Sequence, residues 1–194
     1  MLSHKQRETL LKVARESVQA AAAGQSYRPP ETEDTELLRP AAVFVTLNKE
    51  GQLRGCIGTV EARQPMIEAV AVLARSSATE DPRFSPVRPA EVVKLDIDIS
   101  VLTPAQRVND VSEIKVGTHG LIIQDGHRRG LLLPQVATDW GWDCAEFLDH
   151  CCLKAGLEKG HWRNGGEIYS FTAEVFGEEQ EGVTCWIGAR RWNC

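Results

Sequence analysis

The amino-acid sequence predicts an α+β protein in which antiparallel hairpins are separated by helices. Two pairs of apolar segments are joined by short turn sequences, at residues 48–51 and at Asp125-Gly126, which is typical of β-hairpins. The helical segments follow hairpins and do not alternate with single strands, so a parallel βαβ sheet is not expected. A chain of 194 residues is also long enough to bury a sizeable core.

The N-terminal part predicts a helix and then the first hairpin. Ser3 and Gln6 have the spacing of a capping box, and apolar residues recur at helical spacing from there until Gly24. The polar segment 25–40 predicts a surface loop. The apolar segments 42–47 and 53–60 on either side of the turn predict the two hairpin strands.

A helix, a loop and a strand are expected next. Pro65 suits the first turn of a helix, and the two prolines within 81–86 predict an ordered loop. Between residues 95 and 101, apolar residues alternate with Asp96, Asp98 and Ser100. This period of two predicts a strand that turns its polar side chains to water or to a cleft.

The remaining elements predict a second hairpin, two helices and a last strand over residues 168–176. Pro134 suits the start of one helix, while Asp143 and Glu146 can cap the next, which Gly156 ends. Turn-rich sequence flanks the hairpin and its helices on both sides. We therefore interpret about 104–166 as a smaller lobe inserted into a larger lobe of about 1–103 and 167–194, within a single domain of residues 1–194.

Charge and composition argue against several classes of protein. The net charge is −5, and the only adjacent basic pairs are at 128–129 and 190–191, so the basic stripe of a nucleic-acid-binding protein is missing. No apolar run approaches the ~20 residues of a membrane span. Without a signal-peptide core, we expect a cytoplasmic protein whose six cysteines are reduced.

Five sequence segments resemble those of one known family. Leu53-Arg54-Gly55-Cys56-Ile57-Gly58 is the hexapeptide signature of the AMMECR1 domain. The other matching segments are Asp81-Pro82-Arg83-Phe84, His119-Gly120-Leu121, Gly130 to Ala137, and Lys154 to Leu157 followed by Trp162. The resemblance runs from about Leu10 to Phe176, and the tail 177–194 matches none of the motifs.

The resemblance carries implications for fold and partners. It implies two α+β lobes with a cleft between them, and it places the hexapeptide on a strand that faces the cleft. In bacteria and archaea the family is associated with a Memo-like protein and a radical S-adenosylmethionine protein (the AmmeMemoRadiSam system), so such partners are expected here. It names no settled molecular activity, and we expect no cofactor.

The hexapeptide contains the candidate catalytic residue, Cys56. Side chains alternate along a strand, so Arg54, Cys56 and Gly58 share one face, and a nearby cation favours the reactive thiolate. The alternative is structural: Cys56 packs as a small apolar residue, the glycines serve sheet curvature, and Arg54 pairs with a carboxylate such as Asp98. No histidine adjoins Cys56 in sequence to act as its base.

The other candidate site residues are proposed to contact substrate, and each has a structural alternative. They are Arg54, Gly55, Gly58, Asp81, Arg83, His119 and Gln135. Asp81 and Arg83 can instead form an ion pair that holds their own loop. The cysteines at 144, 151 and 152 lack the Cys-x-x-Cys spacing of zinc sites, so we expect core packing and no metal.

Two functions therefore stand side by side. One is a protein that binds or modifies a bulky substrate between two lobes, with Cys56 and Arg54 at the floor of the cleft and thiol chemistry as the first reaction to test. The other is an accessory or scaffold module that presents the cleft to a protein partner. The absence of a Gly-rich phosphate loop, a His-Glu metal motif and a Gly-x-Ser-x-Gly elbow favours the second.

Overall fold

The computed structural model describes residues 1–178, and the tail 179–194 lies outside the described residues. The described chain forms two compact units, the first made of residues 1–102 and 174–178 and the second of residues 103–173. Each unit contains one four-stranded sheet. The pairings of β1 with β2 and β3, of β7 with β4 and β5, and of β5 with β6 are all antiparallel. The α+β class with antiparallel sheets is therefore confirmed. No helix among residues 1–178 has the length and apolar character needed to cross a membrane.

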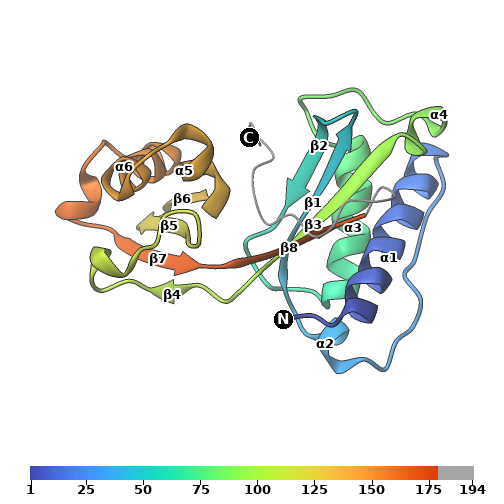
Figure 1. The fold of residues 1–194 in the computed structure, drawn as a ribbon, viewed down its shortest axis with the longest axis horizontal. Coiled ribbons are helices and arrows are strands. Elements are labelled where there is room, and N and C mark those ends of the chain that lie inside the picture. Colours follow the sequence, from blue (N-terminus) through green and yellow to red (C-terminus); the bar gives the residue numbers. More distant parts are fainter. Residues whose placement is uncertain (179–194) are drawn as a thin grey trace. The chain divides into compact units, whose positions relative to one another are not determined.

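The first unit combines four helices with a sheet in the order β2-β1-β3-β8 (Figure 1). Its elements in chain order are α1 (His4–Ala22), α2 (Thr35–Leu38), β1 (Ala42–Lys49), β2 (Gln52–Gly58), α3 (Met66–Thr79), α4 (Pro89–Val92), β3 (Leu95–Leu102) and β8 (Ala173–Gly177). The short helix α2 lies in the segment expected to be a loop. The N-cap that starts it is Asp34, whose carboxylate accepts from the backbone N–H of Glu36 at 2.9 Å.

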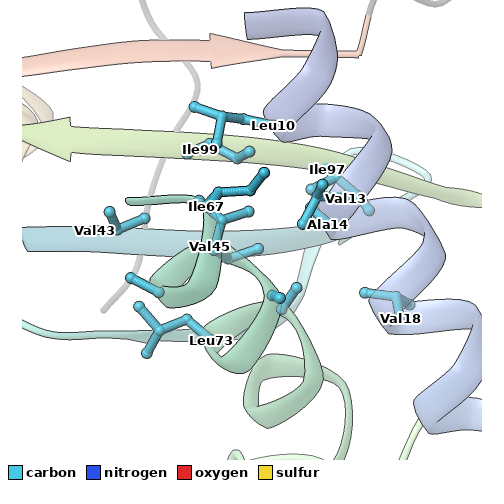
Figure 2. Close-up of a cluster of buried hydrophobic side chains, with 14 of the residues drawn as sticks. Leu10, Val13, Ala14, Val18, Val43, Val45, Ile67, Leu73, Ile97 and Ile99 are labelled. Carbon is cyan, nitrogen blue, oxygen red and sulfur yellow. The ribbon is translucent and has the colours of Figure 1, made fainter. Parts of the chain in front are cut away.

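The core of the first unit lies between the sheet and the helices α1 and α3. Figure 2 shows Leu10 of α1, Val43 and Val45 of β1, and Ile97 and Ile99 of β3 meeting in one apolar cluster. All five side chains are fully buried. Alternation along the strands therefore sends the apolar set toward the helices and leaves the polar set on the opposite face of the sheet.

Local signals in the sequence explain why these elements start and turn where they do. The capping box of α1 is confirmed: Ser3 Oγ accepts from Gln6 N at 3.3 Å, and Gln6 Oε1 accepts from Ser3 N at 2.8 Å. The β1–β2 turn has positive φ at both Glu50 (53°) and Gly51 (77°), as a two-residue type I′ turn requires.

The second unit has a sheet in the order β4-β7-β5-β6 with helices packed against it. Its elements are β4 (Gln106–Arg107), η1 (Val111–Glu113), β5 (Gly120–Asp125), β6 (Arg128–Leu132), α5 (Pro134–Trp140), α6 (Cys144–Lys154), η2 (His161–Arg163) and β7 (Glu167–Phe171). The predicted hairpin around Asp125-Gly126 is confirmed. So is the capping box of Asp143 and Glu146 at the start of α6.

The last predicted strand, over residues 168–176, is in fact two strands in different sheets. β7 pairs with β5 in the second unit, whereas β8 joins β3 in the first. Apolar and polar residues alternate through both strands, and no turn sequence separates them. The alternation therefore did not indicate that the chain passes from one sheet to the other. Two hydrogen bonds hold Thr172, the residue between β7 and β8. Thr172 N donates to Thr103 Oγ1 at 2.9 Å, and Thr103 N donates to Thr172 O at 2.9 Å.

Candidate functional site

The hexapeptide 53–58 occupies β2, at one edge of the first sheet. Gly55 faces α3 so closely that a Cβ atom there would lie 2.2 Å from the carbonyl oxygen of Ser77. Any side chain at this position would push the helix backbone away from the strand. Gly55 is therefore required for close packing, and by alternation its neighbour Cys56 lies on the opposite face of the sheet.

Ser77 ties α3 to both strands of the hairpin. Its hydroxyl donates to Val45 O of β1 at 2.8 Å and accepts from Ile57 N of β2 at 2.9 Å. The side chain is buried, so both hydrogen bonds are shielded from water. One hydroxyl of α3 thus links β1, at Val45, to β2, at Ile57 next to Cys56.

The loop after α3 binds the backbone of Cys56 directly. The Asp81 carboxylate accepts from Cys56 N at 2.8 Å, and Arg83 Nη2 donates to Cys56 O at 3.4 Å. The two loop residues also pair with each other, with Arg83 Nε and Nη2 at 3.0 and 2.9 Å from the Asp81 oxygens. The expected ion pair within this loop is present, and it satisfies backbone groups of the edge strand.

The Asp81 carboxylate is almost fully enclosed, with 2% of its side chain exposed. The hydrogen bonds from Arg83 are the main reason that its pKa falls to about 2, with further help from the Cys56 and Arg83 backbone N–H groups. These contacts outweigh burial, which acts in the opposite direction. Asp81 is therefore a fixed negative charge beside the Cys56 backbone.

Cys56 shares one row of the sheet with a hydroxyl and a carboxylate. Thr46 of β1 is the cross-strand partner of Cys56 on one side and of Asp98 of β3 on the other. Thr46 Oγ1 donates to Cys56 Sγ at 3.3 Å. The Asp98 carboxylate accepts from Asn48 Nδ2 at 2.8 Å. Thiol, hydroxyl and carboxylate thus lie side by side on the face of the sheet away from α1 and α3.

The next row on this face brings Gly58 against an aromatic ring. A Cβ atom at Gly58 would lie 2.1 Å from the ring of Phe44, its cross-strand partner. The missing side chain at position 58 therefore makes room for the ring. Gly58 shapes the surface beside Cys56 through Phe44.

Arg54 pairs with a carboxylate other than the expected Asp98. Its Nη2 lies 3.3 Å from Glu91 of α4, and Lys49 Nζ lies 2.9 Å from the same side chain. These contacts lower the pKa of Glu91 to about 2. The hydrogen bond from Lys49 contributes most, and the bonds from Arg88 N and Arg54 add to it. Arg54 thus shares the single anion Glu91 with Lys49.

His119 and Gln135 belong to the second unit, whereas the other candidate residues belong to the first. His119 precedes β5, and its Nδ1 accepts from Lys115 N at 3.3 Å. Gln135 lies in the first turn of α5 and is half-buried. Within the first unit, the fold places six candidate residues on or beside β2: Arg54, Gly55, Cys56, Gly58, Asp81 and Arg83.

Cysteines 151 and 152 pack in the core of the second unit, as expected. Burial raises the pKa of the Cys151 thiol to about 12, and the thiol donates to the carbonyl oxygens of Leu121 and Gly130 at 3.6 and 3.5 Å. Within residues 1–178, no group of three His, Cys, Asp or Glu side chains is placed to hold a metal ion.

Three residues around Cys56 were not identified from the sequence: Thr46, Ser77 and Glu91. A polar signal existed for Thr46, because it interrupts the apolar strand 42–47 on the same alternation as Asn48. Ser77 and Glu91 carry no such signal. Ser77 is brought to Cys56 by the packing of α3 against β2, and Glu91 is brought to Arg54 by the position of α4.

Comparison with known proteins connects this arrangement to one family. The AMMECR1 family model matches residues 11–176. A protein of Methanothermobacter thermautotrophicus is 43% identical over 186 residues, which cover 92% of this chain and 97% of that protein. A protein of Thermococcus gammatolerans is 44% identical over 184 residues, covering 89% of this chain and 90% of the other.

A solved structure supports the fold. The crystal structure of the uncharacterized protein PH0010 from Pyrococcus horikoshii is similar to this chain with a TM-score of 0.81 at 41% identity. The similarity covers 89% of this chain and 91% of that one. The comparison therefore extends over both sheets and most of the helices.

Proposed function

This chain belongs to the AMMECR1 family, and on that premise we propose that the sheet face around Cys56 binds a bulky substrate and acts on it through the thiol. The observation that carries the proposal is the row Cys56–Thr46–Asp98, in which the Thr46 hydroxyl donates to the sulfur at 3.3 Å. A hydrogen bond to the charged form of a group favours that form. Thr46 is therefore placed to support a thiolate.

The rigidity of β2 supports the same proposal. Ser77 and Asp81 bind the N–H groups of Ile57 and Cys56, and Arg83 binds the Cys56 carbonyl group. A reactive group works best when the strand that carries it is held by a surrounding shell of hydrogen bonds. These contacts hold the thiol in one position relative to Thr46.

A base for the thiol proton is the remaining requirement. The only histidine in residues 1–102 and 174–178 is His4, which lies 3.3 Å from Glu8 at the start of α1. Asp98, in the same row as Cys56, is the carboxylate that we propose for this role.

The test is the rate at which iodoacetamide alkylates each cysteine in the native protein at neutral pH, followed by peptide mass spectrometry. We expect Cys56 to react much faster than Cys151 or Cys152, because thiolate is the reactive form and both helix cysteines are fully buried. Thr46→Val should slow the reaction of Cys56 several-fold. Thr79→Val removes a hydroxyl that donates only to the Arg75 carbonyl group and is the matched control.

Arg54→Gln tests the expectation that the positive charge of Arg54 favours the thiolate of Cys56. Because Arg54 is engaged with Glu91 and has no contact with the Cys56 sulfur like that of Thr46, we expect a smaller effect than that of Thr46→Val. If Cys56 reacts no faster than Cys151 and Cys152, thiol chemistry is contradicted.

The alternative is an accessory module whose Cys56 face binds a protein. It is favoured by the pairing of both neighbouring arginines, since Arg54 binds Glu91 and Arg83 binds Asp81 and each helps to hold β2. We propose the Memo-like and radical S-adenosylmethionine proteins as the partners to test first. A purified partner that shields Cys56 from alkylation, with unchanged labelling elsewhere, would support this role.

A further inference from the structure

A hollow lies in the first unit, on helix surfaces that the Cys56 face does not include. It has a volume of about 400 Å³ and lies between α1, α3 and the connection that follows α1. Figure 1 shows this connection running back alongside α1 toward α2. Binding sites for small molecules have volumes of roughly 300–1,000 Å³, so the hollow suits a small ligand.

The walls of this pocket are held by side-chain hydrogen bonds. Ser17 Oγ of α1 donates to Ala71 O of α3 at 2.6 Å and fixes the two helices side by side. Tyr27 OH donates to Glu16 at 2.7 Å, which holds the connection against α1. Burial and this contact with Glu16 raise the pKa of Tyr27, so the phenol stays neutral at physiological pH. These hydrogen bonds hold the walls of the pocket in place.

The lining combines an apolar surface with cationic groups. Ala71 and Val72 of α3 supply the apolar part, and Arg28 and Arg75 the charge. Arg75 is paired with Glu80 at 3.1 Å, but both side chains are about half exposed, so the pair is weak and can exchange its partner. Arg28 makes no hydrogen bond or ion pair with any residue among 1–178.

Among the described residues, Glu68 is the carboxylate that lines the pocket. Because Arg75 is paired with Glu80, Arg28 is the lining cation left to attract an anion, and Glu68 would repel that anion. Its presence gives a direct way to test the sign of charge that the pocket prefers.

We propose that this pocket binds a small organic anion, an aromatic or aliphatic carboxylate. The apolar body of the ligand lies on Ala71 and Val72, and its carboxylate pairs with Arg28. A guanidinium group that no protein carboxylate occupies matches the geometry of a carboxylate ligand.

The test uses two probes that differ in charge and little in shape: indole-3-acetate and neutral indole-3-acetamide. Binding is followed by shifts of backbone amide signals in ¹⁵N-labelled protein. We expect the acetate to bind with a Kd of about 1 mM, as its size allows, and to shift the signals of Val72 and Arg28. The acetamide should bind about fivefold more weakly.

Three variants make the test decisive. Arg28→Gln should abolish the preference for the acetate, whereas Glu68→Gln should strengthen acetate binding. Arg63→Gln, at an arginine whose side chain is 80% exposed and outside the pocket, should change neither. Because the replaced side chains lie at the surface, an unchanged amide spectrum of the free variant confirms that it is folded.

Several results would overturn the proposal. Equal binding of the two probes, an acetate preference that survives Arg28→Gln, or no saturable shifts at concentrations about tenfold above the expected Kd would each do so. Cys56→Ser should leave probe binding unchanged, so this result is independent of whether Cys56 is reactive.

Discussion

Replacing Asp81 with Asn tests how the Cys56 strand is held. The folded protein keeps the Asp81 pKa at about 2, against an ordinary value of 3.8. Each tenfold difference in proton affinity corresponds to about 1.4 kcal/mol, so the charged form contributes about 2 kcal/mol to stability at neutral pH. Asp81→Asn should lower the free energy of unfolding by at least this amount, because it also weakens the bonds from Cys56 N and Arg83.

The pH dependence identifies the charge as the cause. Because the folded pKa is depressed, the contribution is fully present above the unfolded pKa near 4 and is lost as the pH falls toward 2. The difference between wild type and Asp81→Asn should therefore be constant from pH 7 to about 5 and fall to roughly half by pH 3. Comparing the two proteins cancels the titration of Glu91, which has a similarly low pKa.

Urea unfolding followed by far-ultraviolet circular dichroism is the assay. The long helices α1 and α3 dominate this signal and lie in the same unit as Asp81. Glu33→Gln removes one exposed charge from that unit and should change stability by less than about 0.5 kcal/mol. A difference for Asp81→Asn that stays constant down to pH 3 would refute the electrostatic account.

Two further changes test the packing of α3 against the hairpin. Gly55→Ala should destabilise the protein by about 1–3 kcal/mol in the same unfolding assay, because its Cβ meets the Ser77 carbonyl oxygen at 2.2 Å. Gly165→Ala, where the nearest atom is 3.6 Å away, should be neutral, and equal effects at the two glycines would contradict the argument. Ser77→Ala should cost about 1–3 kcal/mol by removing the hydroxyl that binds Ile57 N, whereas Ser76→Ala, whose hydroxyl binds Glu80, should cost less.

Much of the fold could be predicted because its signals are local. The capping boxes that start α1 and α6, and the Asp125-Gly126 turn, involve residues within a few positions of each other. Such signals act whatever the rest of the chain does. The strand over residues 168–176 shows the limit, since a continuous period of two did not indicate that β7 and β8 join different sheets.

The candidate site was predictable only in part. Strand alternation predicted that Arg54, Cys56 and Gly58 share one face, but the β1–β2 register shifts between Leu47 and Asn48 and leaves Arg54 without a cross-strand partner. The ion pair of Asp81 with Arg83 was expected from the loop sequence and is present. The partner of Arg54 was not, because Glu91 and Asp98 are both distant carboxylates in the sequence and only the position of α4 selects Glu91.

The sequence by itself determined the α+β class, the family motifs, and the strand that carries Cys56, because these depend on residue type and short-range spacing. The tertiary structure alone decided what surrounds the thiol. Thr46 and Asp98 reach its row through pairing of three strands, and Asp81 and Ser77 reach its backbone through the packing of α3. Contacts of this kind join residues 10 to 50 positions apart, and burial of the common apolar core sets their register.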